Sequence, residues 1–122
     1  MNRPVIIVHG GAWDIPDEFV DAHIKGCERA VLAGWDILKN GGSALDAVEE
    51  AIKVMEDDPT FDAGIGSFLN EEGFVELDAL IMDGASLNAG AVASVRRIKN
   101  PISLARKVLE LTSHILLIGE GA

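Results

Sequence analysis

Acidic side chains gather where a helix is expected to end. Glu56, Asp57 and Asp58 close an apolar-periodic stretch, and Asp62 follows in the segment FDAGIG. Exposed acids at a helix carboxyl terminus cost a few tenths to about 1 kcal/mol each, because the peptide dipoles already concentrate negative charge there. A cation held by loop oxygens would offset that charge, since hard ions prefer oxygen ligands. The alternative is a hydrated acidic helix end, which the pattern alone favours.

A glycine turn follows the first apolar run, in VIIVHGGAW. Gly10 and Gly11 could present amide N–H groups to an anion at the carboxyl end of a strand. A nucleotide loop is nevertheless disfavoured, because a third spaced glycine is missing and AWDIPDE brings acids where a phosphate would bind. His9, at the end of the apolar run, is typical of a hydrogen-bonded structural histidine.

No residue has the sequence context of an activated nucleophile. Cys27 falls on the apolar stripe of an expected helix, which indicates an inert core thiol. The serines, Thr60 and Thr112 lack a G-x-S-x-G context. His23 and His114 have no spacing that pairs them as metal ligands. Taken alone, the residues do not form a convincing catalytic centre.

The elements expected to position these residues begin with a strand and two helices. PVIIVHGG is predicted to be a central strand buried on both faces. A helix is expected from about residue 17 to 40, and a second helix begins after Ser43, a capping residue supported by Asp46. The tight NGGS link makes the two helices antiparallel neighbours. Their predicted buried stripes are Val20, Ile24, Cys27, Val31, Trp35 and Leu38, then Leu45, Val48, Ile52 and Met55.

The second half of the chain is predicted to add a sheet. GSFLNEEGFVELDALIMDG reads as two strands joined by a turn at residues 70–73, and GASLNAGAVASV as a third. Asn100 and Pro101 start another helix with Leu104, Val108 and Leu111 inward, and HILLIG is a last buried strand. This order predicts an α+β fold, or a layered α/β arrangement, with the helices on one face of the sheet.

Composition narrows the class of protein. At 122 residues the chain is expected to be a single segment, 1–122, with one core. Its formal charge of -10 argues against nucleic acid or an anionic membrane as partner. A lone cysteine excludes an internal disulfide, and we find neither a signal peptide nor a membrane-spanning segment. We therefore expect a cytoplasmic protein.

Several long blocks resemble one enzyme family. The blocks are VIIVHGGAW, GGSALDAVEEAIKVMEDDPTFDAGIGS, GFVELDALIMDGASLNAGAVASVRRIKNPISLARKV and SHILLIGEGA. Together they are similar to the plant-type asparaginase and isoaspartyl aminopeptidase family, whose members are N-terminal-nucleophile (Ntn) hydrolases with a threonine as nucleophile. The resemblance runs in order from about Pro4 to Ala122. Its length makes it far more specific than any single motif in the chain.

The resemblance implies a precursor that cuts itself into an α and a β subunit, which fold together as a four-layer αββα sandwich. This chain would be the first part of α, and the nucleophile would be the threonine that starts β. A free N-terminal threonine can use its own amine as the base for its hydroxyl. The resemblance further implies hydrolysis of L-asparagine or β-aspartyl dipeptides by a dimer of heterodimers, (αβ)2, and an inactive chain when β is absent.

The resemblance also implies site residues in this chain. A structural sodium ion would be held by the main-chain oxygens of one loop, and Asp62, His9, Gly10 and Gly11 would form a wall of the active site. The family usually has asparagine at position 62, so the carboxylate here could bind the threonine amine yet repel carboxylates of the substrate. Trp13 replaces a small residue in the HGGA turn. The implied sodium ligands are Met55, Glu56, Asp58, Phe61, Ala63 and Ile65.

Two alternatives remain open. The chain could serve a glycosylasparaginase or a threonine aspartase, which share parts of these blocks, although FDAGIG and ELDALIMDGASLNAGAVA favour the isoaspartyl type. It could instead be a truncated, non-catalytic paralogue that binds a partner or has a structural role. A second polypeptide that starts with threonine would discriminate between an enzyme and such a paralogue.

Overall fold

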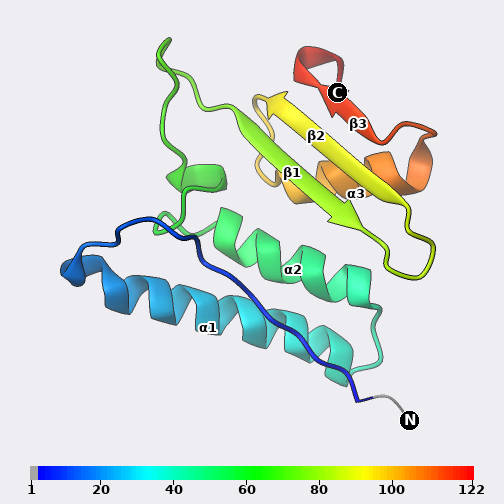
Figure 1. Cartoon of the computed structure of the whole chain (residues 1–122), viewed down its shortest axis with the longest axis horizontal. Coiled ribbons are helices and arrows are strands. Elements are labelled where there is room, and N and C mark those ends of the chain that lie inside the picture. The colour runs from blue at the N-terminus through cyan, green and yellow to red at the C-terminus, as the bar shows by residue number, and fades with distance from the viewer. Residues whose placement is uncertain (1–2) are drawn as a thin grey trace.

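Residues 3–122 are described by a computed structural model, so Met1 and Asn2 of the expected segment 1–122 lie outside the described residues. The expected α+β class is confirmed for this part (Figure 1). Its strands form one sheet in the order β1-β2-β3, with β1 antiparallel to β2 and β2 parallel to β3. The elements are α1 Asp17–Lys39, α2 Ala44–Glu56, β1 Leu77–Met82, β2 Ala89–Val95, α3 Pro101–Leu111 and β3 Leu116–Ile118, with 3-10 turns at Gly64–Gly66 and Gly119–Gly121.

The predicted start of α2 is confirmed in detail. The Ser43 hydroxyl accepts a hydrogen bond from the Asp46 amide at 3.1 Å, and the Asp46 carboxylate accepts one from the Ser43 amide at 3.2 Å. This reciprocal capping box satisfies two amides that the first helical turn leaves free. Gly41, at φ 84°, reverses the chain just before it, so α1 and α2 pack side by side in opposite directions (Figure 1).

The two helices meet through small residues, which corrects the predicted stripes. A Cβ on Gly34 would lie 2.8 Å from the carbonyl oxygen of Ala47, so the backbones approach more closely than large side chains would allow. Four residues expected inside are exposed: Val20, Ile24 and Trp35 of α1 and Val48 of α2. The buried face of α1 was predicted wrongly because large apolar side chains occur on more than one face of this helix, so their spacing does not show which face is buried. The buried residues are His23, Gly26, Ala30 and Gly34 in α1 and Ala47, Ala51 and Glu56 in α2.

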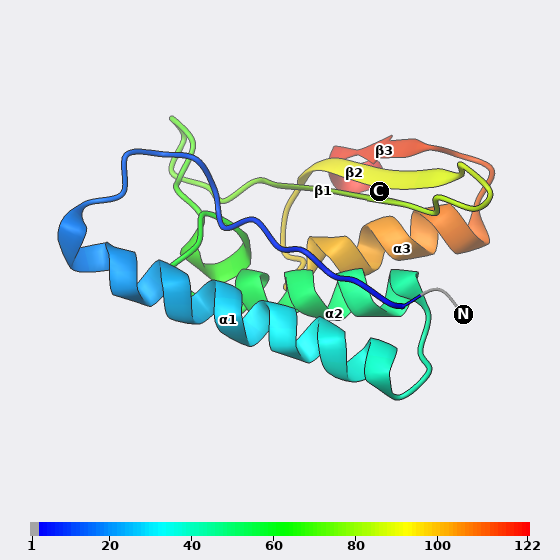
Figure 2. The same ribbon diagram turned by 60° about the horizontal axis from the view of Figure 1, so that its bottom comes forward.

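The predicted first strand is wrong as a paired, buried strand. The chain before α1 is extended, but it pairs with no strand of the described residues. It runs along the α1–α2 pair, where Ile6 packs beside Gly34, while Ile7 is 87% exposed (Figures 1 and 2). An apolar, β-branched run forms a strand only when a neighbour accepts and donates its backbone hydrogen bonds.

Helix α3 covers one face of the sheet. Ile102, Ala105 and Val108 of α3 pack on inward-facing residues of β1 and β2 and form a buried apolar cluster with them. Gly90 allows this contact, because a Cβ there would lie 2.4 Å from the carbonyl oxygen of Ala105. All three helices lie on this side of the sheet, as the segregation of helices predicted (Figure 2).

The opposite face of the sheet is not covered by any described element (Figure 2). Its apolar side chains are exposed because nothing packs on them. The last strand, β3, was expected to be buried, but it is a short strand at the edge of the sheet. Leu111, the last residue of α3, was expected to point inward and is 76% exposed. Two strands were expected on either side of a turn at residues 70–73. Within the described residues the first is absent and the second begins only at Leu77, so residues 67–76 form a loop around the expected turn, which the Asn70 side chain stabilises. The exposed apolar residues on this sheet face are Leu80, Met82, Leu116 and Ile118.

Within residues 3–122, none of the helices combines the length and apolar character needed to cross a bilayer.

Candidate functional site

The segment that follows α2 curls tightly on itself. The amide of Asp58 donates to the carbonyl oxygen of Met55 at 3.2 Å, and the amide of Phe61 donates to that of Asp58 at 3.2 Å. The Asp58 carboxylate accepts a further hydrogen bond from the Thr60 amide at 2.9 Å. These bonds curl residues 55–61 from the end of α2 into a tight turn, and four of the six residues expected to hold sodium lie in that stretch.

Two glycines reveal where some of the loop carbonyl groups point. A Cβ on Gly64, whose φ is 61°, would lie 2.2 Å from the Glu56 carbonyl oxygen. A Cβ on Gly66 would lie 2.2 Å from the Phe61 carbonyl oxygen and 2.7 Å from that of Pro59. These oxygens therefore pack directly against the glycine backbones, in positions that a side chain would block. Glu56 and Phe61 are two of the residues whose main-chain oxygens the resemblance assigns to sodium.

The acids at the end of α2 have protein partners, which removes the charge argument for a bound ion. Asp57 is bonded by Lys99 at 2.8 Å, and this hydrogen bond holds the pKa of Asp57 below its ordinary value. Burial pushes the pKa of Asp58 upward, but hydrogen bonds from Thr60 and Arg29 bring it below the usual range. The unfavourable helix-end charge is thus compensated by neighbouring basic and amide groups.

Glu56 differs from the other two acids because it is buried, with only 3% of the residue exposed. One oxygen accepts from the Ile102 amide at 3.0 Å and the other from the Asn100 side-chain amide at 3.0 Å. Burial raises the pKa of Glu56, and these hydrogen bonds oppose the rise. The sequence analysis assigned Glu56 only a main-chain role and did not predict that its buried side chain binds the start of α3.

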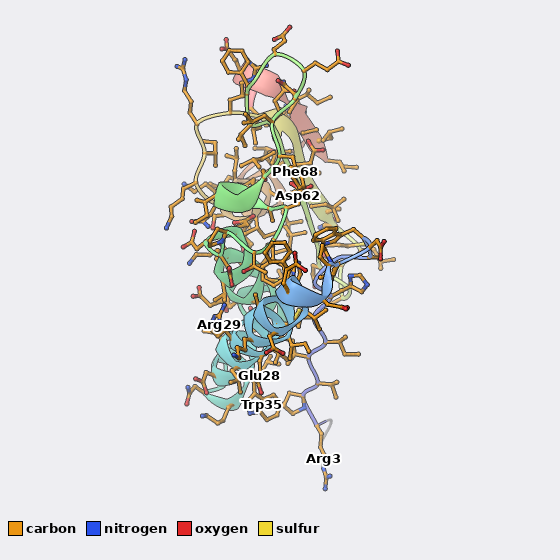
Figure 3. All side chains as sticks on the ribbon, turned by 90° about the vertical axis from the view of Figure 1, so that its left-hand side faces the viewer. Arg3, Glu28, Arg29, Trp35, Asp62 and Phe68 are labelled. Carbon is orange, nitrogen blue, oxygen red and sulfur yellow. The ribbon has the colours of Figure 1, made fainter. Side chains whose placement is uncertain are left out.

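Asp62 reaches a cavity of about 340 Å³. One carboxylate oxygen accepts a hydrogen bond from the Phe68 amide at 3.0 Å, which closes the loop over residues 62–68 (Figure 3). Glu76 and Asp78, on either side of the first residue of β1, line the same cavity. An arrangement with several carboxylates favours a cationic or amine group over an anion. The alternation of Glu76 and Asp78 around one apolar residue was the signal that could have placed them on one face.

The HGG turn packs against the same loop. A Cβ on Gly10 would lie 3.1 Å from the Phe61 ring, so the turn and the residue preceding Asp62 are in contact. Gly11, at φ 105°, donates its amide to the Nδ1 atom of His9 at 3.1 Å. This confirms the expected hydrogen-bonded histidine, although the ring is exposed. Asp62 and the glycine turn thus lie in one region of the molecule.

Other candidate groups have structural positions. His23 is 7% exposed, donates from Nδ1 to the Phe19 carbonyl oxygen at 2.8 Å, and lies between the rings of Trp13 and Phe61. The Thr112 hydroxyl donates to the carbonyl oxygen of Val108 at 2.8 Å, at the end of α3. Within residues 3–122, no three histidine, cysteine or acidic side chains gather to hold a metal ion. An ion in the loop would depend on main-chain oxygens.

Comparison with known proteins identifies the family. The sequence model described as Asparaginase matches residues 2–122. The chain is 57% identical over 120 residues to the isoaspartyl peptidase/L-asparaginase of Xenopus laevis, covering 98% of this chain and 39% of that protein. It is 61% identical over 118 residues to the plant-type L-asparaginase of Pyrococcus furiosus, covering 96% of this chain and 38% of that protein. The chain therefore spans about two fifths of the length of these relatives. On this evidence the chain belongs to the asparaginase family.

Proposed function

We propose that this chain is the first part of the α subunit of an amidohydrolase that acts on L-asparagine or β-aspartyl dipeptides. The observation that carries the proposal is a cavity lined by carboxylates, with Asp62 at its edge, in a chain about 60% identical to enzymes named for these reactions. Because the chain covers 38% to 39% of those enzymes, the activity belongs to a larger assembly.

In this proposal the nucleophile is a threonine at the start of a β subunit. Its hydroxyl attacks the amide carbon, an ester forms, the C–N bond breaks and the amine leaves with a proton. Water then hydrolyses the ester and regenerates the hydroxyl. The task of this chain is to help hold the threonine amine. The oxygen of Asp62 that is not bonded to Phe68 would accept a hydrogen bond from this amine, and the amine, uncharged before the attack, takes the hydroxyl proton and passes it to the leaving amine.

The surfaces without partners support a β subunit as the missing layer. The extended segment before α1 has unpaired backbone groups, and the outer sheet face presents large apolar side chains to solvent. Unpaired strand edges and apolar sheet faces are features that proteins normally cover. We propose that the β subunit covers both, as in a four-layer αββα sandwich, and that two such units form (αβ)2 in the cytoplasm.

We propose a structural sodium ion in the loop from Met55 to Ile65. Support comes from the tightly packed loop, in which the carbonyl oxygens of Glu56 and Phe61 lie against Gly64 and Gly66, and from the preference of hard cations for oxygen ligands. The ion would fix the loop that carries Asp62 and would take no part in bond breaking. Melting the complete protein, meaning this chain with its proposed β subunit, in sodium-free buffer and with added sodium tests this. We expect a higher midpoint with sodium, and an unchanged midpoint would contradict the ion.

Release of ammonia from L-asparagine and of amino acid from a β-aspartyl dipeptide tests the main proposal. We expect the complete protein to be active and this chain, purified as a monomer, to be inactive. Sequencing the amino termini should reveal a second polypeptide that starts with threonine. Hydrolysis by the isolated chain would overturn the proposal, whereas an inactive protein without a second polypeptide would favour the non-catalytic paralogue.

A further inference from the structure

The carboxylate of Glu56 joins two parts of the chain that are distant in sequence. It ends α2, yet its hydrogen-bond donors are the Ile102 amide and the Asn100 side chain, 46 and 44 residues away. The Ile102 amide belongs to the first turn of α3, where Asn100, the residue before the helix, provides no side-chain cap of its own. Glu56 therefore replaces the missing cap, and its negative charge is favourable at this helix end.

The main chain of Glu56 has a second contact. Its carbonyl oxygen lies so close to Gly64 that a Cβ on Gly64 would be 2.2 Å away. The turn Gly64–Gly66 thus rests on the backbone of the same residue whose side chain caps α3. A shift of Glu56 would move both contacts together.

Both contacts border the cavity that Asp62 lines. Asp62 and Gly64 line it from the loop, Pro101 lines it from the start of α3, and Glu56 lines it where the two meet. Neighbouring bonds reinforce the junction, since the side-chain amide of Asn100 also donates to the Asp57 carboxylate at 3.0 Å. One buried residue therefore contacts both the loop and the start of α3 where they line the cavity.

We propose that Glu56 is a positioning residue: its carboxylate holds the start of α3, its carbonyl group holds the 64–66 turn, and together they set the placement of Asp62 in the cavity. The inference rests on the proposed function for its effect on catalysis. Its structural content, that the single residue Glu56 orders both the loop and the start of α3, is independent of that function.

The test compares Glu56→Gln and Glu56→Ala in the complete protein. Glutamine keeps an acceptor for the Ile102 amide but turns an N–H group toward the amide of Asn100, and alanine removes both acceptors. Glu50→Gln is the matched control, because Glu50 is on the same helix and pairs with Lys53 at 2.9 Å within it. The readouts are hydrogen exchange, segment by segment, and the separate values of kcat and KM.

We expect Glu56→Ala to speed exchange about tenfold or more in both 57–68 and 99–103, with a smaller effect for Glu56→Gln and none for Glu50→Gln. We expect kcat of the folded alanine variant to fall by about 10- to 100-fold, with a smaller change in KM, because misplaced groups lose transition-state contacts. Faster exchange confined to 99–103, with unchanged kcat, would overturn the inference. An inactive wild-type protein would overturn the proposed function, and the exchange pattern would still decide the role of Glu56.

Discussion

Replacing Gly64 with alanine tests the geometry of the loop directly. Gly64 has φ 61°, a conformation that costs an L-residue about 1–2 kcal/mol. The new methyl group would also lie 2.2 Å from the Glu56 carbonyl oxygen and 2.8 Å from its carbonyl carbon, so the backbone must move. Overpacking of this kind costs about 1–3 kcal/mol. We therefore expect Gly64→Ala to lower the free energy of unfolding by about 2–5 kcal/mol.

Gly73→Ala is the matched control. Gly73 also has a positive φ, 80°, but a Cβ there would meet nothing within 4 Å. Its expected cost is the conformational part alone, about 1–2 kcal/mol. Urea denaturation of the complete protein and both variants measures the difference, which we assign to the contact with Glu56. Equal losses for the two variants would refute the inward orientation of the Glu56 carbonyl group.

Two further predictions follow from other positions. Ser43→Ala should cost about 1 kcal/mol in urea denaturation at neutral pH, because the capping box is lost. Hydrogen bonds from Ser43 lower the pKa of Asp46. The stability that the Asp46 carboxylate contributes is therefore present above the ordinary carboxyl pKa and is lost as the pH falls through the lowered pKa. If Ser43→Ala lost as much unfolding free energy in acid as at neutral pH, this reasoning would be contradicted. Asp62→Asn keeps an acceptor for the Phe68 amide, so stability should change by less than about 0.5 kcal/mol, and KM for asparagine should fall because a carboxylate that repels the substrate is removed. A higher KM with unchanged stability would show that the charge of Asp62 assists binding.

Local signals in the sequence predicted where two helices begin. The spacing of Ser43 and Asp46 located the start of α2, and Asn100 with Pro101 located the start of α3, although the Asn100 side chain does not cap that helix. These predictions succeeded because caps and prolines act on backbone groups within one helical turn. The resemblance also led to the family that comparison confirmed.

Local signals could not predict contacts between segments that are distant in the sequence. The cap that Glu56 provides to α3 depends on donors 44 and 46 residues away, and no local pattern encodes it. The α1–α2 contact depends on Gly34, whereas apolar periodicity favoured the larger Ile24 and Trp35. Residues 4–8 were predicted to be a buried strand because they are apolar and β-branched. Such residues favour a sheet, but they form a strand only where another strand lies beside them, and the sequence does not show whether one does.

The central claim is that this chain shapes an active site whose nucleophile another polypeptide supplies. An electrophilic asparagine analogue, incubated with the complete protein and followed by intact-mass analysis of each polypeptide, tests it most directly. We predict one covalent adduct on the polypeptide that starts with threonine and none on the chain that carries Asp62. An adduct on this chain, at Cys27, Thr60 or any other residue, would contradict the claim.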